Sequence, residues 1–378
     1  MLKKNIKIGC IGLYDPKNIR TQSGVAFMMC KAFENMGAEV VWIQTVPTLR
    51  YKMTNIFCKI ILKLFKINLI CNKYITSSKE LAKNIDKTKF HDIDIFLCIN
   101  SPESVAYLDL PKPLIYRSDS TFNLMIDYYI FNVSKKTKRE GNIIEQKVLN
   151  KASIVLYPSL WAKKSALIDY KQEEEKLHVI ESGANIEEIK ISNNKYKKNG
   201  VLNLLFLGVD WKRKGGDIAL EACRYLYEKN IDVKINIVGI KKISSKVNDL
   251  PYVNYIGFLD KNNQEEYDKL LTLIESSHIL LLPTIAECAG IVFCECSAFG
   301  LPSFTYDTGG VGNYVINGIN GYRLPLGSRG EDFGEKIYQC IQTDEINILS
   351  KQAVDLYNEK LNWKVWQEKV EDIVNNII

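Results

Sequence analysis

The chain has 378 residues, of which 46% are hydrophobic and 25% charged, so it can build two or three domains with apolar cores, and we expect a folded globular protein. No stretch of 18 residues is free of charge, which excludes an evident membrane-spanning helix. The net charge of +6 is uneven, because residues 1–190 hold 29 Lys and Arg against 20 Asp and Glu, while residues 191–378 hold 21 against 24.

The cysteines and histidines give no sign of a metal or nucleophile site. Ten cysteines are scattered without C-x2-C pairs, which favours reduced, buried thiols in a cytosol. The three histidines flank strand-like runs and form no zinc or Cys/His constellation. The N-terminal MLKKNIKIGC lacks a signal peptide's apolar core and cleavage site. We therefore expect a cytoplasmic protein without metal or cofactor.

In the first half, apolar runs alternate with helical patterns, as in a parallel sheet wrapped by helices. Strands are predicted at 6–13, 39–43, 93–99, 114–117, 154–157 and 177–180, and helices near 24–36, 78–85, 141–151 and 159–170. The polar loop that contains Ser23 and Gly24 runs from the first strand into the first helix, where ligands dock in such sheets.

Residues 51–90 form the most basic segment, with nine lysines and two acids. Ile56, Ile60, Leu64 and Ile67 recur at helical spacing, so Asn55–Leu69 is predicted to be a basic amphipathic helix of the kind that lies on anionic lipid. The alternative is a helix that packs on its own domain and keeps its lysines in water. Nucleic-acid binding is disfavoured, because the basic residues of this segment are all lysines and include no arginine readers.

Asp92 and Asp94 spell D-x-D, a pattern that binds a metal ion in some enzymes. They open an apolar strand and share one of its faces, which is more typical of a solvated strand entry than of a metal site.

The polar, basic segment 191–200 has no apolar period and predicts a domain boundary between 190 and 191. Beyond it, strands are predicted at 202–207, 233–238, 253–256, 279–282 and 303–306, with helices near 215–229, 264–276 and 291–299. A final helical pattern covers 362–378, so the second domain is assigned to 191–361.

The loop after the strand at 202–207 has the features of an anion site. Gly208 lets the strand turn, Gly215 and Gly216 open the next helix, and Arg213 and Lys214 precede its N-terminus, where a diphosphate would bind. The alternative is a solvated charge run. Neither G-x-G-x-x-G nor a Walker loop occurs.

The stretch from Ser276 to Pro325 predicts a strand, an acidic loop and a helix. The strand stops at Pro283, Glu287 and Gly290 follow, and Val292, Cys296 and Phe299 share an apolar helix face with Glu295 beside it. Glu287 could accept hydrogen bonds from hydroxyls held on the helix amides. Glu295, about 12 Å further if the span were helical, suits the other end of a long ligand. Two acids at a fixed spacing are also common as a loop acid and a helix cap.

Further glycines follow in the same order, at Gly300-Leu301-Pro302, Gly309-Gly310, Asn317-Gly318 and Asn320-Gly321. Together with Glu287, Gly290 and Glu295 they resemble the signature of the retaining GT-B glycosyltransferases of family 4. That resemblance implies an α/β chain of GT-B architecture, with two Rossmann-like parallel-sheet domains facing across a cleft and the helix at 362–378 crossing back to the first domain.

The resemblance also implies roles for individual residues. Glu287 and the loop amides of Cys288, Ala289, Gly290 and Ile291 would hold the donor sugar, and Glu295 would hold the ribose. Lys214 matches the family lysine, whereas Val209 stands where the family often has Arg, so Arg213 would substitute. In the first domain Ser23 and Gly24 match a loop that approaches donor phosphate and sugar. Asp119 falls where the family commonly has a catalytic His, with Tyr116 and Thr121 beside it.

The implied function is a retaining, metal-independent hexosyltransferase. It would move a sugar from a nucleotide diphosphate donor to a glycan or lipid-linked acceptor, in bacterial surface polysaccharide synthesis, with peripheral contact to the inner membrane face through residues 51–90. The alternatives are a nucleotide-sugar epimerase or hydrolase on the same fold, or a non-catalytic subunit of a glycosylation complex. A dehydrogenase is disfavoured by the missing glycine fingerprint.

Overall fold

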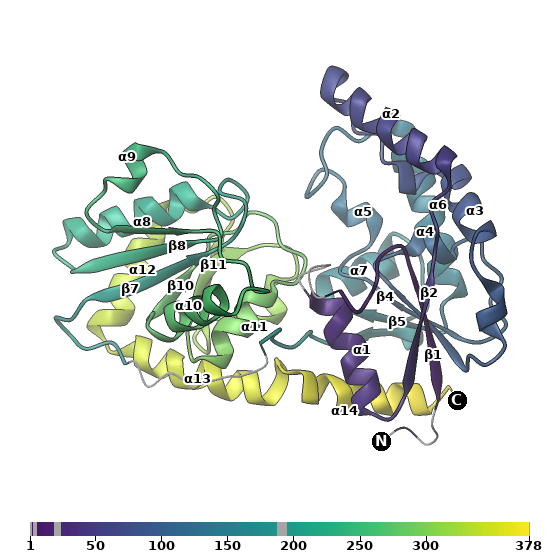
Figure 1. Cartoon of the computed structure of the whole chain (residues 1–378). Coiled ribbons are helices and arrows are strands. Elements are labelled where there is room, and N and C mark those ends of the chain that lie inside the picture. The colour runs from purple at the N-terminus through teal and green to yellow at the C-terminus, as the bar shows by residue number, and fades with distance from the viewer. Residues whose placement is uncertain (1, 3–5, 19–23, 187–194, 378) are drawn as a thin grey trace. The chain divides into compact units, whose positions relative to one another are not determined.

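The computed structural model describes residues 2, 6–18, 24–186 and 195–377, and it divides into two compact units (Figure 1). The first unit combines Met1–Asn185 with Trp363–Ile378, and the second is Ile186–Asn362. The boundary predicted between 190 and 191 lies outside the described residues, and the two compact units divide slightly earlier, between Asn185 and Ile186.

The described part of the first unit contains a six-stranded parallel sheet in the order β2-β1-β3-β4-β5-β6. Its strands are β1 (Lys7–Gly12), β2 (Glu39–Gln44), β3 (Ile95–Ile99), β4 (Leu114–Arg117), β5 (Ile154–Tyr157) and β6 (Leu177–Val179). Its α-helices are α1 (Val25–Asn35), α2 (Leu49–Phe65), α3 (Ile75–Lys83), α4 (Pro102–Val105), α5 (Phe122–Met125), α6 (Lys135–Lys151), α7 (Leu160–Ile168) and α14 (Trp363–Asn375), and its 3-10 turns include η2 (Cys71–Lys73), η3 (Lys87–Phe90) and η4 (Glu174–Lys176).

Helices cover this sheet on both faces, which explains why its central strand β3 is apolar throughout (Figure 1). All five residues of β3 are buried. Residues of α3, α4, α6 and α7 join one core cluster with the sheet. Elsewhere α14 packs on α1, where the rings of Phe33 and Trp366 meet edge to face at 5.5 Å. The C-terminal helix therefore belongs to the first unit.

The described part of the second unit holds another six-stranded parallel sheet, in the order β12-β11-β10-β7-β8-β9. Its strands are β7 (Leu202–Leu207), β8 (Val233–Val238), β9 (Val253–Gly257), β10 (Ile279–Leu281), β11 (Ser303–Asp307) and β12 (Gly321–Pro325). Its helices are α8 (Gly216–Glu228), α9 (Ser245–Asn248), α10 (Gln264–Glu275), α11 (Ile291–Ala298), α12 (Gly330–Gln342) and α13 (Glu345–Lys360), with the 3-10 turn η5 (Val311–Asn313).

The predicted strands and long helices are all present, most of them within a few residues at their ends, but α2 and α6 each begin six residues earlier than predicted. The strand β12, the helices α12 and α13 and the short helices α4, α5 and α9 add to them. The burial of α11 extends beyond the apolar face expected from Val292, Cys296 and Phe299. Phe293 to Ala298 are all buried, since α11 lies against both β11 and α13, and only Ile291 and Val292 at its start are half-buried. A helix that is covered over most of its surface does not need an amphipathic pattern.

Candidate functional site in the second unit

Lys214 and Glu287 meet because their strands are neighbours. Lys214 follows β7 and Glu287 follows β10, and these strands pair in parallel, so both loops leave the carboxyl edge of the sheet side by side. Lys214 Nζ lies 2.5 Å from Glu287 Oε2, and the two side chains are 10% and 13% exposed. The structure thus brings together two predicted site residues that are 73 positions apart.

Arg213 is the second cation at this carboxylate. Its Nη1 lies 3.7 Å from Glu287 Oε2 and donates a 3.0 Å hydrogen bond to the carbonyl oxygen of Ala286. The backbone also joins the two loops, because Ile285 N donates to Arg213 O at 2.9 Å. Val209, at the position where the resembled family often has Arg, is 69% exposed. Two cations facing one carboxylate give this group a net positive charge, which favours an anionic ligand.

Two glycines let these loops approach each other. A Cβ on Gly208 would lie 2.8 Å from Cγ of Lys214, so the lysine stem passes directly over this residue. Gly215 has φ of +74°, and a Cβ there would lie 2.0 Å from the carbonyl oxygen of Pro283. Only glycine fits this place at the N-terminus of α8.

The loop after Glu287 leads into the N-terminus of α11. Gly290 has φ of +94° and is the N-cap of the helix, without a side-chain capping bond. Cys288 and Ala289 are buried, and Ile291 begins the helix. Gly310 N donates to Glu287 O at 3.0 Å, so the predicted Gly309-Gly310 turn fixes the backbone of this loop.

Glu295 has its own cationic partner, which the sequence did not reveal. Lys261, in the loop after β9, places Nζ 2.7 Å from Glu295 Oε1, and Glu295 is only 4% exposed. Burial lowers the pKa of Lys261, but the adjoining Glu295 carboxylate more than offsets this, so the pKa is raised overall. The one available signal was that Lys261 follows a strand at the carboxyl edge of the sheet.

Among the predicted site residues of the first unit that the structure describes, Asp119 is partly exposed and its two predicted neighbours are buried. Asp119 Oδ1 lies 2.6 Å from Nη1 of the buried Arg117, and its other oxygen accepts a 2.9 Å bond from Asn100 Nδ2. Tyr116 and Thr121, which the sequence places beside Asp119, are buried and use their hydroxyls in hydrogen bonds inside the unit. Asn100, at the carboxyl end of β3, has φ of +50°, a left-handed conformation that Asn adopts more readily than most other residues.

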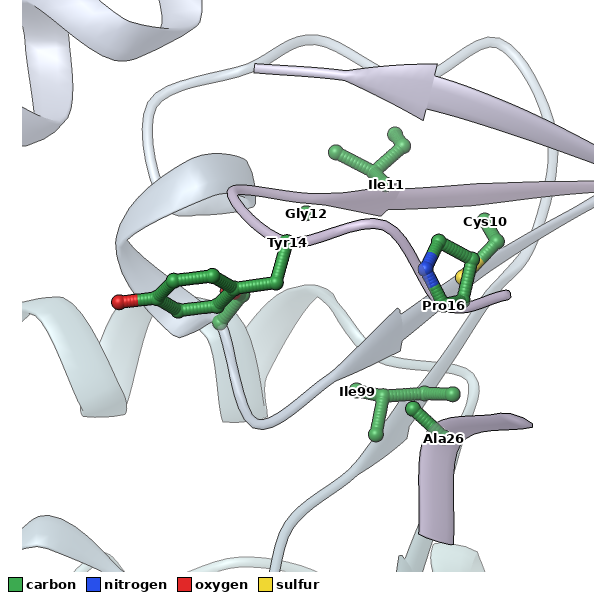
Figure 2. A pocket seen from close by; sticks show the side chains of 8 residues that line it. Cys10, Ile11, Gly12, Tyr14, Pro16, Ala26 and Ile99 are labelled. Atoms are coloured by element: carbon green, nitrogen blue, oxygen red, sulfur yellow. The ribbon is translucent and has the colours of Figure 1, made fainter. Parts of the chain in front are cut away.

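A small pocket lies at the carboxyl ends of β1 and β3, next to the start of α1 (Figure 2). It is lined by Cys10, Ile11, Gly12, Tyr14, Pro16, Ala26, Ile99 and Ser101. Gly24, the N-cap of α1 with φ of +79°, precedes Ala26 by two residues. Ser23 lies outside the described residues.

Asp92 and Asp94 have separate structural contacts. Asp94 accepts a 2.9 Å hydrogen bond from the backbone N–H of Lys7, whereas Asp92 contacts His91 at the surface. Both precede β3 and so lie at the amino edge of the sheet, away from the loops that carry Asp119 and Gly24. Their positions fit the strand-entry interpretation of this D-x-D.

Comparison with known proteins agrees with this architecture. Residues 185–354 match the family model of glycosyl transferases group 1. An uncharacterised glycosyltransferase of Methanocaldococcus jannaschii is 26% identical over 160 residues, which are 42% of this chain and only 44% of that relative.

Solved structures resemble the whole chain. A glycosyltransferase from Rickettsia africae has a TM-score of 0.65 at 16% identity, with 99% of this chain and 98% of that chain covered. The Anabaena protein HepE, crystallised with UDP and glucose, has a TM-score of 0.64 at 14% identity, with 98% and 99% covered. The chain therefore has the GT-B glycosyltransferase fold, and its second unit matches the glycosyl transferases group 1 family.

Proposed function

We propose that this protein transfers a hexose-like sugar from a nucleotide diphosphate donor to a glycan or lipid-linked acceptor, with retention of anomeric configuration. The observation that carries the proposal is the group formed by Arg213, Lys214 and Glu287 at the carboxyl edge of the second sheet. It combines a net positive charge with a carboxylate acceptor, and these are the two features that a sugar diphosphate requires.

In this proposal Lys214, Arg213 and the first amides of α8 hold the diphosphate, as helix N-termini do for anions. Glu287 accepts hydrogen bonds from sugar hydroxyls beside the amides at the start of α11, and Glu295, oriented by Lys261, accepts from the ribose. The described fold supports this division, because the pairs Lys214–Glu287 and Lys261–Glu295 each join a loop at the carboxyl edge of the sheet to the segment around α11.

The proposed reaction breaks the bond between the anomeric carbon and the diphosphate oxygen. The acceptor oxygen bonds to the same face of that carbon, and its proton passes to the departing phosphate. Charge on the leaving diphosphate is neutralised by Lys214 and Arg213, so no metal ion is needed. Asp119, held by Arg117 and Asn100, lies on the acceptor side in the first unit, and a role in bacterial surface polysaccharide synthesis is part of the proposal.

The test is to incubate the full chain with UDP- and GDP-sugars and candidate acceptors, to measure nucleotide release, and to determine the anomer formed by NMR. Glu287→Gln should reduce transfer about 10²–10³-fold, the usual cost of losing one electrostatic contact to the reacting group. Glu228→Gln, an exposed acid on α8, is the matched control. An inverted product would refute retention, and equal turnover by the two variants would refute the site.

A further inference from the structure

Helix α2 exposes an unusual combination of side chains. Leu49, Met53, Ile56, Phe57, Ile60 and Leu64 are all exposed, from 48% at Ile60 to 75% at Leu49. Their spacing of three and four residues places them on one side of the helix. Soluble surfaces seldom keep so many large apolar residues together, and such a strip indicates an interaction site.

The opposite side of α2 attaches it to the first unit. Cys58 is the buried residue of the helix and packs with Cys71 and Tyr74 in a small cluster, with Tyr51 against it. Cys71 Sγ donates to the carbonyl oxygen of Tyr51 at 3.6 Å. Ile56 and Ile60 lie about half a turn away from Cys58, so the apolar strip faces away from this attachment.

Basic residues border the strip, and residues 40–79 contain no acid. Lys52, Lys59 and Lys63 are exposed, and their spacing of seven and four residues places them along one edge of the strip. Arg50 is exposed as well. We define the basic apolar face as these four residues together with the six apolar residues named above.

A second segment extends this face beyond the end of α2. Asn68 N donates to Asn132 O at 2.8 Å, and Ser134 N donates to Asn68 O at 3.1 Å, so residues 131–134 lie beside the chain that leaves the helix. Phe131 is 58% exposed, and Lys135 and Lys136 are exposed too. Two distant parts of the sequence thus present apolar and basic side chains at one place.

We propose that the basic apolar face binds the surface of an anionic lipid bilayer, with the apolar strip among the acyl chains and the lysines at the headgroups. The charge decides the occupant, because an apolar strip alone would also fit a second copy of the chain, whereas the acid-free lysine border would repel that copy and attract anionic lipid. Among the described residues, no helix is long and apolar enough to cross a bilayer. The contact is therefore peripheral.

The experiment measures flotation of the full-length protein with phosphatidylcholine vesicles that contain 0 or about 30% phosphatidylglycerol, at low and high salt. We expect binding to the anionic vesicles, weakened by salt. Lys52→Ala/Lys59→Ala/Lys63→Ala should bind about 100-fold more weakly, since each lysine near an anionic surface contributes a factor of about five. Lys234→Ala/Lys351→Ala/Lys364→Ala removes three exposed lysines elsewhere and should leave binding unchanged.

The apolar strip is tested separately with Met53→Ser/Ile60→Ser/Leu64→Ser, which should abolish flotation while the far-ultraviolet circular dichroism spectrum stays that of the wild type. Ile168→Ser/Ile348→Ser, exposed apolar residues of α7 and α13, is the control. Equal binding to neutral and anionic vesicles overturns the proposal. So does a strip that mediates concentration-dependent dimerisation without any vesicle binding. Flotation needs no sugar donor, so its outcome is independent of the proposed transfer reaction.

Discussion

Removing the charge of Lys214 tests the donor site most directly. A unit charge about 4 Å from the leaving diphosphate contributes roughly 4 kcal/mol at the effective dielectric near a protein surface. Arg213 remains close to the same carboxylate and keeps a positive charge at the site, so the net loss is smaller. We expect Lys214→Ala to lower kcat/KM for the donor about 10²–10³-fold.

The fold should survive this change. Glu287 keeps Arg213 at 3.7 Å, so the free energy of unfolding should fall by about 1–2 kcal/mol rather than the roughly 3–5 kcal/mol seen when a buried charge loses its counter-charge. The matched control is Lys212→Ala, which removes an exposed lysine from the same loop. The assays are initial rates of nucleotide release and calorimetric titration with UDP and GDP.

If Lys214→Ala turns over donor and binds nucleotide within about threefold of Lys212→Ala, Lys214 does not hold the diphosphate. A large loss in both variants would show instead that the general positive charge of the loop matters, and not the contact with Glu287. Lys214→Arg tests geometry, because it keeps the charge but changes the shape of the donor group.

Glu295→Gln should weaken binding of UDP or GDP by about tenfold, and Lys261→Met should weaken it to a similar extent, because Lys261 orients Glu295. Calorimetric titration measures both affinities, and full affinity in either variant would contradict the assignment of Glu295 to the ribose. Burial raises the pKa of Glu145 to about 7, against the opposing effects of Lys73 and Tyr116, so its ionisation destabilises the fold as pH rises from 4.5 through 7. Compared with wild type, Glu145→Gln should therefore gain up to about 3 kcal/mol in unfolding free energy between pH 5 and pH 8, seen as a growing difference in melting temperature. A difference that does not change with pH would contradict this. Sugar transfer should continue in excess chelator, whereas activity that is lost and then restored by magnesium or manganese would refute metal-independent catalysis.

The strands were predictable because parallel sheets covered on both faces need continuous apolar runs, as in β3 and β7. Helix α11 was predicted as well, but the extent of its burial was not, because much of that burial comes from α13, which lies far along the chain and was not itself predicted. The membrane-type helix was placed at Asn55–Leu69, but α2 begins at Leu49, where Thr48 accepts a hydrogen bond from Tyr51 N and caps it.

The parts of the candidate site that could be predicted are those next to a turn that the local sequence indicates. Gly215 before Gly216 indicated a helix N-terminus, and the acid after Pro283 indicated a loop at the sheet edge. Lys261 could not be assigned in this way. It lies in the loop after the edge strand β9, and only the folded loop brings it to Glu295, 34 residues further along the chain. The packing of Tyr116 and Thr121 likewise depends on α6 and α7.

The return of α14 to the first unit has a consequence for biosynthesis. The first unit is assembled from both ends of the described chain, so its core around Phe33 stays incomplete until Trp366 has left the ribosome. The second unit is translated between these two segments, so it can fold before the last helix of the first unit has been synthesised. A chaperone that shields apolar surface would therefore be needed longest by the part of the protein that is made first.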